Sequence, residues 1–200
     1  MFLILKDFMF YRIPKNKMKQ MNRLVLISGC SSGGKSTLLS ELKSREYTTV
    51  SEVGREIVKE QLAAGSDVTP WQKPIEFCEL LIERSIAAYK LAQGMTGAKG
   101  QVIFFDRSFL EGVGYFQSLN IHRYDHFIDE LRYYPTIFIA PPWKEIFCQD
   151  EERKHTFEDA VADYERDLKF YSDCGYSIAE LPKASVEERI EFMLSILCKG

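Results

Sequence analysis

A glycine-rich segment near the start of the chain has the composition and spacing needed to bind a polyphosphate. Residues 29–37 read Gly-Cys-Ser-Ser-Gly-Gly-Lys-Ser-Thr and fit the phosphate-binding pattern G-x-x-x-x-G-K-[ST]. Glycines let successive N–H groups turn inward on the phosphates, Lys35 can reach the β- and γ-phosphates, and the Ser36 hydroxyl can bind Mg²⁺. The positions expected to contact the nucleotide in this phosphate loop are Gly29, Cys30, Ser31, Ser32, Gly33, Gly34, Lys35, Ser36 and Thr37.

The segments on either side of the phosphate loop support this prediction. Residues 24–28 form an apolar run typical of a buried strand, and residues 36–43 have the pattern of a helix. The start of that helix adds a dipole that favours negative charge. An Asn-Lys-x-Asp signature for guanine does not follow the loop. The expected donor is therefore ATP with Mg²⁺.

Alternation of apolar runs and amphipathic segments predicts the fold class. Strand-like runs occupy 24–28, 48–52, 101–105, 136–140 and 176–181, and helical patterns occupy 36–43, 55–64, 75–92, 107–119, 122–132, 157–171 and 186–197. This order predicts an α/β fold, a three-layer sandwich whose mainly parallel, five-stranded sheet carries helices on both faces. Ligands bind beyond the carboxyl ends of such strands, where Ser28, Glu52, Asp106 and Ala140 are expected.

Length, charge and cysteine usage restrict the class of protein. The chain has 200 residues, of which 46% are apolar, and this suits one α/β domain over residues 21–200. The net charge of −3 argues against an extended nucleic-acid surface, and no apolar run is long enough to span a membrane. The five cysteines are widely spaced and form no C-x-x-C pair, which favours a reduced, cytoplasmic protein.

Residues 1–20 differ from the rest of the chain. Met1 to Phe10 is mostly apolar, and the basic residues between Arg12 and Arg23 follow with no acid among them. A secretory signal has its charges first and a longer apolar run, so this order does not fit secretion. Residues 1–20 are either a basic arm or an extension that precedes a domain beginning near Met21.

A carboxylate and an arginine follow the buried run 101–105. Asp106 has the position of a Walker B carboxylate, which can hold Mg²⁺ directly or through water together with Ser36. The alternative is that Asp106 caps the next helix. Asp106-Arg107-Ser108 resembles the Asp-Arg-[Tyr/Phe/Ser] motif of thymidylate kinases and the Glu-Arg-Ser motif of deoxyribonucleoside kinases. The resemblance implies that Arg107 faces the transferred phosphoryl group or the substrate.

The stretch from Leu81 to Gln117 is also similar to thymidylate kinases in order and spacing. This resemblance implies that Arg84, within a predicted helix, faces the acceptor of the phosphoryl group. The alternative for Arg84 is a surface ion pair with an acid one turn away.

From Leu24 onward, the chain is similar to small predicted P-loop ATPases grouped with NadR-type nicotinamide riboside kinases. The features that carry this resemblance, besides the phosphate loop, are Glu52-Val53-Gly54-Arg55-Glu56-Ile57, Pro70-Trp71, Phe105-Asp106-Arg107, Pro142-Trp143, Asp150-Glu151-Glu152-Arg153, Gly175-Tyr176 and Leu181-Pro182. The resemblance implies a P-loop NTPase fold and a loop at Pro182 that packs against adenine. Ser32 departs from the pattern, because related kinases commonly have glycine there.

Glu52 and Arg55 lie where the acceptor of a phosphoryl group is expected. Nucleoside kinases that this chain resembles place the carboxylate that receives the acceptor proton at the position of Glu52. The alternative is a solvated glutamate at a strand end. Arg55 is expected on the same side of a helical turn, where it either binds an acidic acceptor or pairs with Glu52.

Residues 143–156 are too rich in charge to form core and follow the fourth predicted strand, where nucleotide kinases have their lid. A lid supplies cations that close over the γ-phosphate and exclude water, and Arg153 is the first candidate and Lys154 the second. The alternative is a solvated helix face.

His122 and His126 are spaced i, i+4 with Asp129 nearby, a spacing compatible with zinc. The pattern provides no third specific ligand, and a surface helix explains the same residues.

These observations lead to one main hypothesis and one alternative. The main hypothesis is a cytoplasmic, Mg²⁺-dependent ATP phosphotransferase acting on a small acceptor such as a nucleoside or nucleotide. Lys35, Arg107 and Arg153 would stabilise the transferred group, Ser36 and Asp106 would hold the metal, and Glu52, Arg55, Arg84 and Arg107 would contact the acceptor. The alternative is a regulatory ATPase or GTPase that binds a protein or lipid partner and phosphorylates no acceptor.

Overall fold

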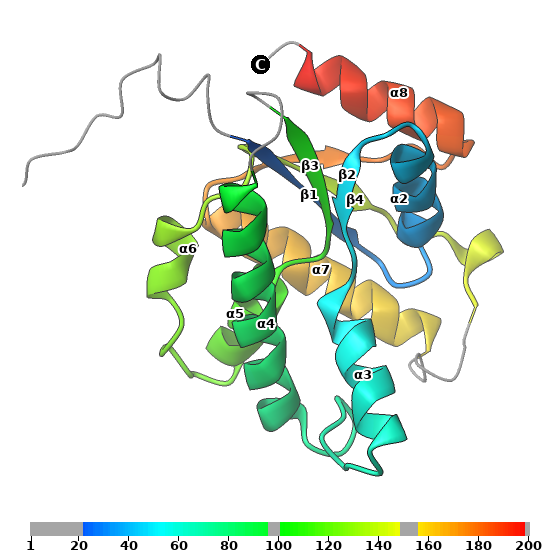
Figure 1. Ribbon diagram of the computed structural model, residues 1–200. Helices are drawn as coiled ribbons and strands as arrows, with labels where there is room; N and C mark the ends of the chain where they lie inside the picture. The colour runs from blue at the N-terminus through cyan, green and yellow to red at the C-terminus, as the bar shows by residue number, and fades with distance from the viewer. Residues whose placement is uncertain (1–21, 96–100, 149–155, 199–200) are drawn as a thin grey trace, which may run out of the picture.

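The computed structural model describes residues 22–95, 101–148 and 156–198, which fold around one parallel sheet (Figure 1). Its strands are β1 (Arg23–Gly29), β2 (Thr48–Val50), β3 (Val102–Asp106), β4 (Thr136–Ala140) and β5 (Ser177–Glu180). They lie in the order β2-β3-β1-β4-β5, and every neighbouring pair is parallel. The predicted α/β class and five-stranded sheet are therefore confirmed.

Helices connect the strands, as parallel pairing requires. Over the described residues they are α2 (Lys35–Ser44), α3 (Val53–Ala63), α4 (Pro74–Gly94), α5 (Phe109–Ser118), α6 (His126–Glu130), α7 (Phe157–Asp173) and α8 (Val186–Leu197), with a short 3-10 helix η1 (Lys144–Ile146). None of these described helices combines the length and apolar character that a membrane crossing would need.

Helices cover both faces of the sheet, because alternate residues of each buried strand point to opposite sides. Leu24 and Leu26 of β1 pack in a core with residues of α4, α5 and α7. Val25 and Ile27 point the other way, into a core with α2 and α8 (Figure 1). The α3 helix packs on α4 through a smaller cluster that includes Ile57, Val58 and Phe77. This three-layer arrangement fixes the carboxyl ends of β1, β2 and β3 side by side.

The helix predicted from Arg107 begins two residues later. The Ser108 hydroxyl accepts a hydrogen bond from the Leu110 N–H, and the Glu111 carboxylate accepts one from the Ser108 N–H. This reciprocal capping starts α5 at Phe109. The suggestion that Asp106 caps this helix is wrong, since Ser108 does so and Asp106 ends β3.

Three other predicted elements are shorter than expected, among them the strand predicted over 176–181, which is limited to Ser177–Glu180. The helix predicted over 122–132 is limited to His126–Glu130, and the strand predicted over 48–52 ends at Val50. Glu52 consequently occupies the N-cap position of α3. The predicted extension 1–20 and the lid candidates Arg153 and Lys154 lie outside the described residues.

Candidate nucleotide and acceptor site

The phosphate loop connects β1 to α2 and is held against the end of β4. Gly29 has a φ of 105°, and a Cβ atom there would lie 2.4 Å from the Ala140 carbonyl oxygen. The Cys30 N–H donates to that same oxygen at 2.8 Å. A side chain at position 29 would break this contact, so only glycine fits the start of the loop.

Ser32 also adopts a left-handed backbone conformation, with a φ of 58°. Glycine reaches this region without steric cost, which gives a physical reason for the glycine that related kinases commonly carry there. In this chain the Ser32 hydroxyl donates to the Cys148 carbonyl at 2.7 Å. The loop is thereby tied to the segment that follows η1.

Lys35 lies buried under its own loop. Its Nζ donates to the carbonyl oxygens of Gly29 at 3.1 Å and Cys30 at 2.7 Å. Burial and the neighbouring Arg107 lower the pKa of Lys35 to about 8, although Asp106 and Glu52 oppose the shift. A polyphosphate bound in the loop would give this buried amine an anionic partner.

Asp106 is buried at the carboxyl end of β3, with 6% of its surface exposed. Burial raises the pKa of Asp106 to about 6, with Lys35 opposing and Glu52 adding to the shift. Its Oδ1 has no hydrogen-bond partner within residues 22–95, 101–148 and 156–198. Asp106 and the exposed Ser36 line one hollow. An unpartnered carboxylate oxygen that shares a hollow with a serine residue fits Mg²⁺, which prefers a few protein oxygens and several waters.

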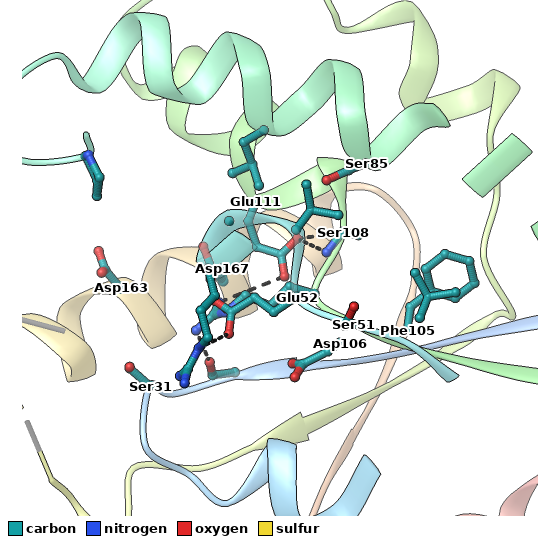
Figure 2. Close-up of a pocket in the computed structure, with 18 of the residues that line it drawn as sticks. Ser31, Ser51, Glu52, Ser85, Phe105, Asp106, Ser108, Glu111, Asp163 and Asp167 are labelled. Atoms are coloured by element: carbon teal, nitrogen blue, oxygen red, sulfur yellow. Dashed lines mark hydrogen bonds and ion pairs between the residues drawn. The ribbon is translucent and has the colours of Figure 1, made fainter. Parts of the chain in front are cut away.

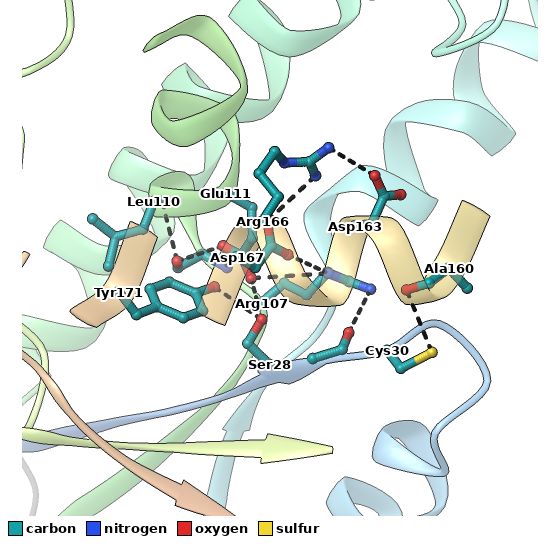
Figure 3. A network of polar contacts seen from close by, with 12 residues as sticks. Ser28, Cys30, Arg107, Leu110, Glu111, Ala160, Asp163, Arg166, Asp167 and Tyr171 are labelled. Carbon is teal, nitrogen blue, oxygen red and sulfur yellow. Dashed lines mark hydrogen bonds and ion pairs between the residues drawn. The ribbon is translucent and has the colours of Figure 1, made fainter. Parts of the chain in front are cut away.

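Arg107 has a φ of 63°, which is uncommon for a residue with a side chain. This backbone turn sends the guanidinium back across the phosphate loop, where Nη2 donates to the Gly29 carbonyl at 3.0 Å. Its Nε lies 3.4 Å from Glu52 Oε1. Its Nη1 lies 4.0 Å from Glu111 and 3.9 Å from Asp167 (Figure 3). Burial alone would lower the pKa of Arg107, but these carboxylates together raise it.

A buried polar network behind Arg107 holds residues that sequence reasoning missed. The Tyr171 hydroxyl donates to Ser28 Oγ at 2.9 Å, and Ser28 donates to Glu111 Oε1 at 2.6 Å (Figure 3). Asp167, which is 4% exposed, accepts from Arg166 at 3.3 Å. The available signal was spacing, since Asp167 shares one face of α7 with the buried Ala160, Tyr164 and Tyr171.

The buried Asp167 carboxyl predicts a specific dependence of stability on pH. Burial, followed by the charge of Glu111, raises the pKa of Asp167 from 3.8 to about 7. The folded protein therefore holds this proton more tightly than the unfolded chain does. The contribution of Asp167 to stability is complete below pH 4 and is lost as the pH rises to 7.

We expect Asp167→Asn to unfold with a free energy on the order of 1–2 kcal/mol higher than wild type at pH 8. The gain should shrink steadily toward pH 4.5, where the wild-type carboxyl is protonated. Urea denaturation at intervals between these pH values measures both curves. Parallel curves for the two proteins would show that Asp167 does not titrate in this range.

Glu52 reaches toward the phosphate loop and not into bulk solvent. Its Oε1 pairs with Arg107, and its Oε2 lies 3.7 Å from Arg55 Nε. Of the two possibilities for Arg55, the structure therefore shows the pair with Glu52. Glu52 lines cavities on both sides of Arg107, which places it between the phosphate loop and the space beyond.

The first of these spaces, the inner cavity, has a volume of about 250 Å³. Apolar side chains of α3 and α4 and the ends of β2 and β3 form its walls, and Tyr133 and α7 complete it. Figure 2 shows the carboxylates of Glu52, Asp106, Glu111 and Asp167 gathered around this cavity. The inner cavity is therefore a space of small-molecule size that opens beside the phosphate loop.

The second space, the loop cavity, has a volume of about 410 Å³ and lies on the α8 side of the phosphate loop. Its lining includes Lys35, Ser36 and Thr37, the segment Ala184 to Val186, and Trp143 and Ile146 near η1. Within the described residues, Pro182 and Lys183 are not part of this lining, which resumes at Ala184. Ser31, Glu52 and Arg107 line both cavities.

Arg189 of α8 is a further residue of the loop cavity that sequence reasoning missed. It is 2% exposed, and its Nη2 donates to the Gly33 carbonyl at 3.0 Å. Burial lowers its pKa. This contact ties the last helix of the chain to the phosphate loop.

Comparison with models of known protein families identifies the family of this chain. A family model described as an AAA domain matches residues 24–189. The chain belongs to this AAA domain family. The match covers the phosphate loop, both cavities and Arg189. It also supports the fold, which is that of a P-loop NTPase.

Solved structures similar to this AAA domain include small kinases. Deoxyadenosine kinase from M. mycoides, in a structure with the products dCMP and a flexible dCDP, has a TM-score of 0.60 at 16% identity; the match covers 88% of this chain and 100% of that one. Thymidylate kinase from Candida albicans has a TM-score of 0.59 at 17% identity, with 90% and 92% covered. At these identities the likeness concerns the fold. No curated protein matches the sequence.

Two predicted positions of this AAA domain lie away from the cavities. Arg84 Nη1 pairs with Glu60 Oε2 of α3 at 2.5 Å, and Arg84 is not among the described residues that line either cavity. Its predicted position facing the acceptor is therefore not the one in the structure, because α4 turns Arg84 toward α3 and its neighbour Ser85 inward. His122 pairs with Asp125 at 2.9 Å. The described residues contain no group of three or more His, Cys, Asp or Glu arranged for a metal ion.

Proposed function

We propose that this AAA domain is a cytoplasmic phosphotransferase that moves the terminal phosphoryl group of ATP to a small acceptor. One observation carries the proposal: Ser31, Glu52 and Arg107 line both a cavity around the phosphate loop and a separate cavity of about 250 Å³ beyond it. A hydrolytic switch needs a space for its nucleotide alone. Two spaces that meet at a carboxylate and an arginine suit transfer between two bound molecules.

The residues between the cavities provide what phosphoryl transfer requires. Lys35 and Arg107 would stabilise the charge on the transferred group, since positioning and electrostatics are nearly all that this reaction needs. Glu52 would orient the acceptor hydroxyl and accept its proton, and its contacts with Arg55 and Arg107 hold the carboxylate in place. Ser36 and Asp106 would hold Mg²⁺, which neutralises phosphate charge when bound.

The fold neighbours support a nucleoside-like acceptor. One of them is a deoxyadenosine kinase whose structure contains dCMP and dCDP, and another is a thymidylate kinase. Their likeness to this chain extends over at least 88% of its length. A nucleoside or nucleotide is therefore the first class of acceptor to test.

The direct test measures ADP release with and without a panel of nucleosides, nucleotides and nicotinamide riboside. We expect one acceptor to stimulate release strongly, with a matching phosphorylated product. Glu52→Gln keeps the size of the side chain and removes its basicity, so it should lower stimulated release by about 10²- to 10⁴-fold. Slow ADP release that no acceptor in the panel stimulates would favour the regulatory NTPase instead.

Glu60→Gln provides the matched control. Glu60 lies on the same helix as the Glu52 cap, is exposed, and pairs with Arg84 outside both cavities. We expect this variant to keep the stimulated rate within about two-fold of wild type, because exposed ion pairs contribute little. An equal loss in both variants would contradict the role assigned to Glu52.

A further inference from the structure

Arg189 is a buried cation of the loop cavity to which the proposed reaction assigns no role. It is 2% exposed, its Nη2 donates to the Gly33 carbonyl at 3.0 Å, and its Nε is enclosed with no hydrogen-bond partner among the described residues. Burial alone lowers the pKa of Arg189, since no described carboxylate contributes to the shift. A buried guanidinium with no acid beside it is unfavourable unless a ligand supplies the negative charge.

The loop cavity as a whole carries an excess of positive charge. Its described lining contains the three cations Lys35, Arg107 and Arg189 and a single carboxylate, Glu52. Arg107 pairs with that carboxylate, and the charges of Asp106 and Glu52 both act on Lys35. Arg189 is therefore the cation of this lining whose charge no described carboxylate balances. A polyphosphate has the charge and the acceptor oxygens that such a cavity fits.

The nitrogen of Arg189 that remains for a ligand is Nη1. It has no hydrogen-bond partner among the described residues and, in contrast to Nε, is not enclosed. Nη1 lies 2.7 Å from the position that a Cβ atom would have on Gly34, and both residues line the loop cavity. Glycine at position 34, with a φ of 78°, permits the backbone turn and also leaves space for the guanidinium. Nη1 therefore lies directly beside the backbone of the phosphate loop.

The arrangement of the loop cavity indicates which phosphate Nη1 would contact. Glu52 and Arg107 line both cavities, so the terminal phosphoryl group is expected beside them. In loops of this pattern the lysine, here Lys35, reaches the β- and γ-phosphates. Residues 184–186 line the loop cavity and not the inner cavity, and Arg189 follows them by one turn of α8. Arg189 therefore lies toward the nucleoside end of a bound polyphosphate, where the α-phosphate is.

We propose that Arg189 binds the α-phosphate of the donor nucleotide through Nη1, while its Nη2 holds the phosphate loop through the Gly33 carbonyl. This role rests on the nucleotide binding that the proposed function includes, and it requires no acceptor. The polyphosphate is then shared between two buried cations, with Lys35 at the β- and γ-phosphates and Arg189 at the α-phosphate.

The contribution of Arg189 to affinity is tested by calorimetry with ATP and Mg²⁺. In Arg189→Met we expect the Kd for ATP to rise about 10- to 100-fold, because a charge-assisted hydrogen bond is lost. Arg23→Met is the matched control: Arg23 Nη1 also donates to a backbone carbonyl of α8, that of Leu197 at 2.8 Å, and Arg23 lines neither cavity. Its Kd should stay within about two-fold of wild type. An unchanged Kd in Arg189→Met, or an equal rise in both variants, overturns the proposed contact.

A second measurement separates contact with the α-phosphate from support of the loop. The Rp and Sp isomers of ATP with sulfur on the α-phosphate differ in which non-bridging oxygen is replaced, and Arg189 approaches from one side only. We expect the ratio of their Kd values to change at least about 5-fold in Arg189→Met, while the ratio for the isomers with sulfur on the β-phosphate stays within about two-fold. If Arg189 only supports the loop, all four compounds bind more weakly and the α-isomer ratio is unchanged, which overturns the proposed contact.

Arg189→Lys is measured in parallel, and it decides the question if Arg189→Met does not fold in urea denaturation. Lysine keeps the charge but lacks the fork that serves two acceptors, so the Kd for ATP should rise about 2- to 10-fold and the α-isomer ratio should still change. No change in either value overturns the contact. Wild-type protein that binds ATP but phosphorylates no acceptor contradicts the phosphotransferase alone, and wild-type protein that binds no ATP contradicts both proposals.

Discussion

Replacing Arg107 by methionine is expected to lower the free energy of unfolding by about 3–5 kcal/mol and to abolish acceptor-stimulated ADP release. The guanidinium faces Glu52, Glu111 and Asp167, and of these Glu111 and Asp167 are 9% and 4% exposed. Without the arginine, these carboxylates remain in a buried space with less positive charge. Urea denaturation at pH 7.5 measures the loss of stability.

Two further variants test whether the loss of stability in Arg107→Met comes from the buried carboxylates that Arg107 neutralises. Adding Asp167→Asn removes one of the stranded charges, so the double variant should recover part of the stability and none of the activity. Arg45→Met is the control, because Arg45 pairs with Glu41 and Glu187 at the exposed surface. It should change the free energy of unfolding by less than about 1 kcal/mol. Equal stability of Arg107→Met and wild type would contradict the charge balance described for this network.

Replacing Lys35 by methionine is expected to lower the stimulated rate by about 10²- to 10³-fold, the typical effect of removing one preorganised group at a developing charge. The effect on folding should be small. Lys35 is buried and this burial lowers its pKa to about 8, so removing its charge should cost little folding stability. The loss of the hydrogen bonds to Gly29 and Cys30 opposes this gain.

Isothermal calorimetry with ATP and urea denaturation separate the two effects of Lys35→Met. Binding of ATP should weaken, while the midpoint of unfolding stays close to wild type. Lys169→Met, at an exposed lysine of α7 that pairs with Asp173, should leave both measurements unchanged. A large drop in the stability of Lys35→Met would mean that Lys35 mainly supports the loop, and its assignment to the transferred phosphoryl group would then lose its basis.

The parts of the site that are local in sequence could be predicted from it. The phosphate loop carries its own glycines, and Asp106 ends an apolar run that could only be a buried strand. The fold followed from the alternation of such runs with helical patterns. In each case the residues that determine the structure are within a few positions of one another.

The parts that depend on distant residues could not be predicted. Ser28 meets Glu111 and Tyr171 only after the sheet and α7 have packed, across 83 and 143 positions of the chain. Arg107 was expected to begin a helix, but the cap at Ser108 starts α5 later and leaves Arg107 in the left-handed region. The orientation of Arg84 could not be predicted either. Arg84 and Ser85 are neighbours on α4, and only the packing of α4 against the rest of the fold decides that Ser85 faces the cavity.

The buried contacts of Arg107 have a consequence for the energetics of a reaction at this site. In water, solvent dipoles must reorient each time charge moves between two reactants. Here the carbonyl of Gly29 and the surrounding carboxylates fix the guanidinium before any ligand arrives. The reorganisation is completed once, when the chain folds, and it does not recur in each catalytic cycle.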